Sequence, residues 1–116
     1  MKIELLDKEY LPDGFEYPVS LLKIIDLGLT NIDPWFIQSK ELAILRINGL
    51  RVRYPSRILV PFAQRRDRDD VACFDLNEPG KIQIIHDFAS PGWEQRKVYE
   101  DFWDWFKDAI EEMIRF

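Results

Sequence analysis

Three aspartates, Asp67, Asp69 and Asp70, lie close together in the sequence, as metal ligands often do. Clustered carboxylates can bind a hard cation such as Ca²⁺ or Mg²⁺. A calcium loop, however, spreads its ligands over about 12 residues and ends in a glutamate, and this segment lacks that spacing. We therefore expect a solvated loop without a bound metal, and we keep the three aspartates as a candidate contact with a protein partner.

The chain has a single histidine, His86, and the aspartate that follows it could orient the ring for general-base catalysis. Both residues lie at the end of a predicted strand. Because neighbouring side chains in a strand point to opposite faces of a sheet, Asp87 should not face His86. We therefore expect a structural histidine.

Cys73 is the only cysteine, so it forms no disulfide within the chain and cannot by itself build a zinc site. It lies in the apolar run VACFDL, which favours a buried core residue over a catalytic thiol. The sequence shows no nucleophile-elbow motif and no glycine-rich loop suited to phosphate. Paired carboxylates could still catalyse a reaction, but no two of them stand out. The sequence thus predicts no enzymatic activity and no cofactor.

Arginines are concentrated in the middle of the chain. Seven of them lie from Arg46 to Arg68, where Asp67 is the only acidic residue, so this segment carries a charge of +6. Such a segment could bind phosphates. The whole chain, however, has a net charge of −5, which argues against nucleic-acid binding and suits a basic partner. We expect these arginines to pair with flanking carboxylates.

Local signals place one helix and one short strand in the first third of the chain. After an irregular lead-in over residues 1–16, Pro18 and Gly28 bracket the helical pattern PVSLLKIIDLG. A loop is predicted over residues 31–34, and a short strand over residues 35–37 follows it.

Ser39 is suited to cap a second helix. An apolar stripe continues past Gly49 to Tyr54, which favours one long helix. The alternative is a stop at Gly49 followed by a strand over residues 50–54, where apolar and basic side chains alternate. The pattern does not decide between these two.

The second half of the chain predicts a β-hairpin. The apolar run ILVPFA indicates a buried strand, and Pro61 places it near a sheet edge or a strand end. Strands over residues 70–76 and 82–88 flank a turn over residues 77–80. The segment 89–92 then breaks the pattern.

Residues 97–115 have the apolar period of an amphipathic helix. Apolar side chains, including Val98 and Tyr99, cover about half of its circumference on the helical wheel and must pack on a sheet. The other half carries six carboxylates against Lys107 and Arg115, and it either faces water or contacts a basic partner. The carboxylates predicted to make that contact are Glu100, Asp104, Asp108 and Glu111.

Trp93 follows the break over residues 89–92 and is predicted to lie on a loop. An exposed tryptophan would be suited to anchor an interface. A tryptophan folded onto the sheet fits the sequence equally well. Together with the loop from Asp67 to Asp70, Trp93 is the second candidate contact surface.

Three stretches of the sequence, VPFAQRRDRDDVACFDL, GKIQIIHDFASPGWEQR and VYEDFWDWFKDAIEEM, resemble the SUKH superfamily, which is named for its similarity to a yeast cell-wall assembly regulator. The resemblance covers roughly residues 58–113, and the helix PVSLLKIIDLG fits the first helix of the family loosely. In place of the Asn-Gly-Gly that commonly follows that helix, this chain has LGLTN.

The resemblance implies an α+β fold with a mostly antiparallel sheet covered by helices. It also implies a bacterial immunity protein, which binds and silences a cognate toxin, often a nuclease. We therefore expect a protein-binding module that neutralises a toxin by occlusion. The alternatives are a regulatory scaffold of the cell-wall-regulator type and, less favoured, a small metal-dependent hydrolase.

Length and composition set the frame for these expectations. The chain has 116 residues, which suits one domain over residues 1–116, and 47% of them are hydrophobic, enough for a core. No run approaches the roughly 18 apolar residues of a membrane span, and the start lacks the apolar stretch of a signal peptide. We expect a cytoplasmic protein without membrane contact. The oligomeric state stays open.

Overall fold

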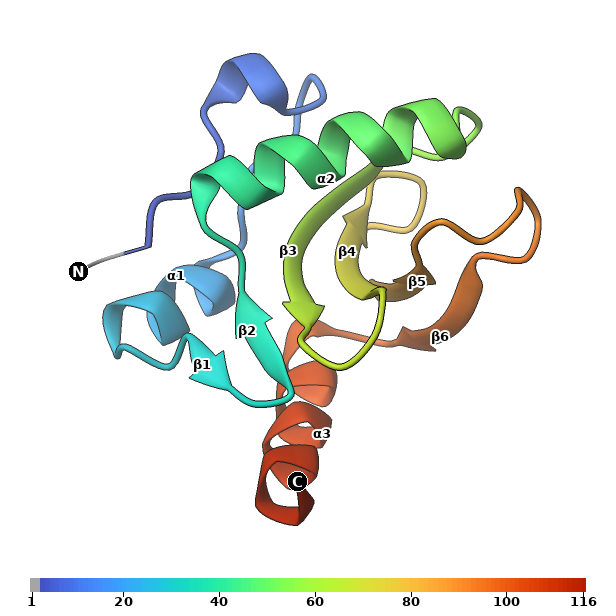
Figure 1. Ribbon diagram of the computed structural model, residues 1–116. Coiled ribbons are helices and arrows are strands. Elements are labelled where there is room, and N and C mark those ends of the chain that lie inside the picture. Colours follow the sequence, from blue (N-terminus) through green and yellow to red (C-terminus); the bar gives the residue numbers. More distant parts are fainter. Residues whose placement is uncertain (1–2) are drawn as a thin grey trace.

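The computed structural model describes residues 3–116, which form three α-helices, one short 3₁₀-helix and six strands (Figure 1). Residues 1 and 2 of the predicted lead-in lie outside the described part. In chain order the elements are η1 (Lys8–Tyr10), α1 (Val19–Asp26), β1 (Asn31–Ile32), β2 (Trp35–Ile37), α2 (Lys40–Arg53), β3 (Leu59–Arg65), β4 (Asp70–Asp75), β5 (Ile82–His86), β6 (Gln95–Tyr99) and α3 (Phe102–Arg115).

The strands form one antiparallel sheet in which the order across the sheet is the order along the chain, from β1 to β6. Helix α2 is inserted between β2 and β3, and helix α3 follows the last strand. This architecture confirms the predicted α+β class with an antiparallel sheet and a C-terminal helix. No helix within residues 3–116 combines the length and the apolar character that a membrane crossing needs.

Helices cover both faces of the sheet. Along β4, Ala72 and Phe74 belong to the core beneath α1 and α3, whereas Val71 and Cys73 belong to the core beneath α2. Figure 1 shows α2 running across the upper part of the sheet and α3 lying below it. Because both faces are covered, β3 and β4 are buried along their whole length, which explains their nearly continuous apolar sequences. Cys73 is a buried core residue, as the sequence predicts.

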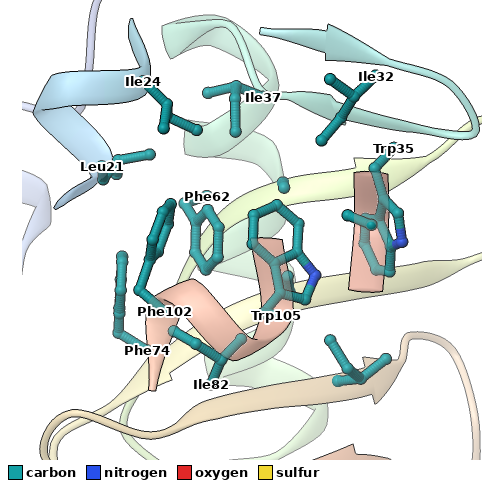
Figure 2. Packing of buried hydrophobic residues seen from close by; sticks show 14 of the residues in the cluster. Leu21, Ile24, Ile32, Trp35, Ile37, Phe62, Phe74, Ile82, Phe102 and Trp105 are labelled. Carbon is teal, nitrogen blue, oxygen red and sulfur yellow. The ribbon is translucent and has the colours of Figure 1, made fainter. Parts of the chain in front are cut away.

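Aromatic rings fix α3 against the sheet (Figure 2). The ring of Phe62 stacks on Phe74 with centroids 4.5 Å apart, and Trp105 of α3 meets Phe62 edge-on at 5.0 Å. Trp35 of β2 meets Trp105 edge-on at 5.6 Å. Edge-on and offset contacts of this kind are the favoured geometries of aromatic pairs. They determine where the first turns of α3 lie.

Several local predictions are confirmed. Gly28, with φ of 75°, ends α1 in the left-handed conformation that glycine adopts most easily. The hydroxyl of Ser39 caps α2 by accepting a hydrogen bond from the Leu42 N–H. The predicted hairpin is formed by β4 and β5, which end at Asp75 and His86, one and two residues before their predicted ends.

Helix α2 continues through Gly49, so the alternative of a strand over residues 50–54 is wrong. Leu50 and Tyr54 lie one turn apart and pack together on the sheet in the core beneath α2. This long-range burial favours helix over the locally plausible alternation of a strand.

The predicted helix over residues 97–115 is wrong at its start. Val98 and Tyr99 belong to β6 and pair with β5 at the edge of the sheet. The helix begins only after Asp101, whose side chain accepts a hydrogen bond from the Asp104 N–H at 2.8 Å. Pairing with β5 is a tertiary interaction, and it overrides the helical period that these apolar residues share with α3.

Two further details of the sheet differ from the prediction. The predicted loop over residues 31–34 contains the short strand β1. Pro61 suggested a position near a sheet edge or a strand end; strand β3 lies inside the sheet, and Pro61 is its third residue. Pro61 pairs with Cys73 on one side, but pairing with β2 stops at Ile37 and Ala63, so no strand lies on the other side of Pro61. A proline is tolerated there because no ladder bond needs its missing N–H.

Candidate functional site

Two of the carboxylates predicted to contact a partner, Glu100 and Asp104, are exposed beside the N-terminus of α3. Asp101 lies between them and caps the helix. We call Glu100, Asp101 and Asp104 the acidic start of α3; within residues 3–116 none of them has an ion-pair partner. Glu111, farther along the helix, lies 3.9 Å from Arg115, and both side chains are largely exposed, so this pair is weak.

Asp108 and Glu112, which lies one turn farther along α3, form hydrogen bonds within the molecule. Asp108 accepts a hydrogen bond from the Tyr99 hydroxyl, and its Oδ2 atom lies 3.4 Å from Lys97 Nζ. The hydrogen bond from Tyr99 and the charge of Lys97 hold the pKa of Asp108 below its usual value. Glu112 accepts a hydrogen bond from Arg65 of β3. The predicted acidic face is therefore divided, because Asp108 and Glu112 are bonded within the fold whereas Glu100, Asp104 and Glu111 stay exposed.

Two of the three aspartates in the loop from Asp67 to Asp70 are also bonded within the fold. Arg65 donates to both oxygens of Asp67 at 2.8 and 3.0 Å, and these bonds lower the pKa of Asp67. Asp70 is buried, and its Oδ1 atom lies 3.0 Å from Nδ1 of His86, whereas Asp69 is exposed. His86 thus faces Asp70 and not its neighbour in the chain. In the described part of the chain, no group of three or more His, Cys, Asp or Glu side chains is placed to hold a metal.

Six of the seven arginines of the middle segment pair with carboxylates, as predicted, whereas Arg51 donates to a backbone carbonyl. Arg46 and Arg53 converge on the fully buried Asp87, with N–O distances of 2.7 to 2.8 Å. The guanidinium of Arg53 also lies 4.2 Å above the ring of Phe88. The other five pairs are Arg51 with the Tyr10 carbonyl, Arg57 with Glu94, Arg65 with Asp67, Arg66 with Asp33 and Arg68 with Asp70.

Trp93 is 82% exposed, so the alternative in which it folds onto the sheet is wrong. It lies on the loop between β5 and β6, whereas the acidic start of α3 follows the other end of β6. Asp70 pairs with His86 at the same end of the sheet as this loop. The structure thus places the two predicted contact surfaces at opposite ends of the strands and does not bring them together.

A groove of about 620 Å³ opens beside the acidic start of α3. Three segments that are far apart in the chain line it, within residues 14–20, 74–80 and 101–103. They are the lead-in to α1 with its first turn, the connection between β4 and β5, and the start of α3. The core contacts of α1 and α3 bring these segments together at one end of the sheet.

Aromatic side chains form the walls of the groove. The ring centroid of Phe15 lies 5.6 Å from that of Phe74, and Trp103 meets Phe102 edge-on at 5.5 Å. Trp103 nevertheless remains 39% exposed. The groove therefore offers rigid apolar surface to a ligand.

Carboxylates are the only charged groups among the described residues that line the groove. Glu16 and Asp101 are exposed. Asp75 is buried, its side chain lies on the α2 face of the sheet beside Leu59, and it accepts a hydrogen bond from the Asn77 N–H at 2.9 Å. None of the three acids forms an ion pair within residues 3–116. An apolar groove with this uncompensated negative charge is suited to a ligand that is both apolar and cationic.

Sequence reasoning missed Glu16 and Asp75. Each stands alone in its own segment, and no motif links the three segments that line the groove. The one local signal is Asp101 with Asp104, which has the spacing of a helix cap and could have placed the start of α3 correctly.

Comparisons of the chain with protein-family models, with curated proteins and with solved structures find no match. Any functional inference therefore depends on the residues and their geometry.

Proposed function

We propose that this protein is a binding module that neutralises a basic toxin by covering its active surface, as an immunity protein does. The observation that carries the proposal is the position of the unpaired acidic side chains. The arginines of the middle segment are bonded within the fold, whereas the acidic start of α3 has no ion-pair partner among residues 3–116 and adjoins an apolar groove. Such a surface suits a partner that combines positive charge with apolar side chains.

The resemblance to the SUKH superfamily supports a toxin as the partner and the bacterial cytoplasm as the place of the encounter. A nuclease toxin carries a basic cleft for its phosphate substrate. An acidic surface that docks on such a cleft accelerates association and excludes the substrate.

The proposed mechanism is occlusion, without a chemical step by this chain. Burial raises the pKa of the Cys73 thiol, which lies in the core beneath α2. His86 lies beside Asp70 at the end of the sheet remote from the acidic start of α3. Neither side chain lines the groove. Long-range attraction would speed the encounter, and burial of apolar surface would slow dissociation.

The test is affinity capture of the tagged protein from its native host, followed by co-expression of the captured protein in a test strain. We expect one stoichiometric basic protein whose toxicity is relieved by this chain. Reversing two charges of the acidic start, with Glu100→Lys and Asp104→Lys together, should abolish both capture and protection. The matched control, Glu41→Lys with Asp69→Lys, reverses two exposed carboxylates elsewhere and should preserve both.

Two outcomes would contradict the proposal. Recovery of a spread of cell-envelope proteins without a toxin would favour the scaffold function. Undiminished capture by the Glu100→Lys/Asp104→Lys variant, with loss of capture by the control, would move the contact surface to the loop that carries Asp69.

A further inference from the structure

The groove beside α3 gives the proposed partner a second point of contact. We propose that it anchors the partner by taking up a large apolar side chain that stands next to an arginine or lysine in an exposed segment of the partner's chain. This inference rests on the proposed function, because it assigns a contact to the same partner. The occupant to which it commits is a basic polypeptide segment.

The aromatic walls of the groove favour an apolar occupant. Phe15, Phe74 and Trp103 present aromatic surface, and contacts with neighbouring rings hold all three in place. A volume of about 620 Å³ lies in the range typical of ligand pockets. An apolar side chain of the partner would displace water from aromatic surface that the fold itself leaves open.

Glu16 and Asp101 favour a cation beside that apolar group. Both line the groove, and neither forms an ion pair within residues 3–116. A purely apolar occupant would remove water from these carboxylates without replacing it, which is costly. An arginine or lysine would supply the missing partner.

The exposed flank of α3 favours a polypeptide as the occupant. Trp103, Ile110 and Ile114 recur at helical spacing on one side of the helix. Ile110 is partly buried, and Ile114 is 76% exposed. Phe106, whose ring lies 5.8 Å from that of Trp103, continues the apolar surface toward Ile110, with the exposed Lys107 beside it on the same side of the helix. An extended segment can follow this surface over several residues.

The test is calorimetric titration of the full chain with capped synthetic peptides. The probe is Gly-Arg-Phe-Arg-Leu-Gly; its controls replace both arginines by glutamate, or the two apolar residues by serine. We expect the probe to bind at least about tenfold more tightly than either control, since both features contribute. Free arginine amide is titrated in parallel, and binding as tight as that of the probe would assign the groove to small cations and overturn the inference.

Variants locate the binding. Glu16→Gln with Asp101→Asn removes two charges but keeps the oxygen atom that accepts the Asp104 N–H, so the fold should persist. We expect this variant to weaken probe binding about tenfold. Ser20→Trp, which places a large ring in the groove from α1, should weaken it comparably, and Glu41→Gln with Asp69→Asn should not. Equal binding by all variants would overturn the inference.

Failure of this inference is distinguishable from failure of the proposed function. If the captured toxin binds the Glu16→Gln/Asp101→Asn and Ser20→Trp variants as tightly as the wild type, the groove is not the anchor, yet neutralisation stands. If the probe binds in the groove but no toxin is captured, the groove's specificity stands and the proposed function fails.

Discussion

Asp87 and Arg53 are joined by two hydrogen bonds of 2.7 and 2.8 Å, and the Asp87 side chain is fully buried. Arg46 binds the same carboxylate from the preceding turns of α2. The aspartate therefore joins α2 to the end of the hairpin. We expect Asp87→Ala to lower the free energy of unfolding by about 3 kcal/mol, because two half-buried guanidinium groups lose their partner.

Urea unfolding followed by circular dichroism measures this loss. The matched control is Asp69→Ala, which truncates an exposed aspartate on the loop before β4 and should change stability by less than about 0.5 kcal/mol. Equal effects of the two substitutions would show that Asp87 is not a structural link.

Gly49 should behave unlike an ordinary glycine in a helix. Alanine in a helix interior is normally about 1 kcal/mol more stable than glycine. A Cβ atom at Gly49, however, would lie 2.9 Å from Cζ of Arg53 and would displace the guanidinium from Asp87. We therefore expect Gly49→Ala to cost about 1 kcal/mol in the wild type and to gain about 1 kcal/mol in an Arg53→Met background. A double-mutant cycle by urea unfolding checks this, and additive effects would contradict it.

Glu100 and Asp108 should differ in their effect on association with the captured partner. Glu100 is exposed and lies outside the helix, so Glu100→Lys should slow association roughly fivefold at low salt and flatten its salt dependence. Asp108 is bonded to Tyr99 and should affect stability more than association when changed to Asn. Stopped-flow measurement over a range of salt concentrations distinguishes the two. If both variants slowed association equally, Asp108 would belong to the contact surface and the acidic face would be undivided.

Acid should destabilise the fold through its bonded carboxylates. Bonds from Arg65 to Asp67 and from Tyr99 to Asp108 lower the pKa of each carboxyl from its ordinary 3.8. In Glu94, burial is the largest single effect and acts to raise the pKa, but the bond from Arg57 together with bonds from the backbone N–H groups of Gly92 and Glu94 outweighs it, and the pKa lies below the ordinary 4.5. A group with a lowered pKa in the folded state takes up protons on unfolding, so its stabilisation is complete above the ordinary values and is lost as pH falls through the folded pKa.

We therefore expect the free energy of unfolding to decline as pH drops below about 4. Urea titrations from neutral to acid pH measure this decline. The slope should be reduced in a variant that combines Asp67→Asn with Asp108→Asn, and it should be unchanged by Glu41→Gln, because Glu41 is exposed and has no ion-pair partner among residues 3–116.

Cys73 should resist alkylation in the native protein. Its side chain is fully buried, and burial raises the pKa of the thiol, so little reactive thiolate forms and no reagent reaches it. We expect iodoacetamide to label Cys73 only at the rate of global unfolding. Mass spectrometry of samples taken over time measures the labelling rate. Fast labelling without denaturant would show that the core beneath α2 opens locally.

The sequence was informative where a signal and its consequence lie close together in the chain. Gly28 ends a helix and Ser39 begins one through backbone contacts within a few residues. The hairpin of β4 and β5 follows from two apolar runs and the turn between them. These elements and the α+β class could be predicted.

Long-range partners account for what the sequence did not reveal. Val98 and Tyr99 carry a helical apolar period, but pairing with β5 makes them a strand. Asp108 belongs to an acidic pattern, yet its hydrogen bond with Tyr99, a residue of β6, leaves it only partly exposed. The groove acid Glu16 acquires its neighbours only when three distant segments meet, and no single segment contains that information.

The agreement between the order of the strands in the sheet and their order in the chain bears on how the molecule folds. From β3 to β6 each strand pairs with the one that immediately follows it, so short loops close the whole of that part of the sheet. Short loops lose little chain entropy on closing, and contacts between near neighbours favour rapid folding. A newly made copy would therefore complete its sheet soon after synthesis, which is what the proposed neutralisation of a toxin would call for.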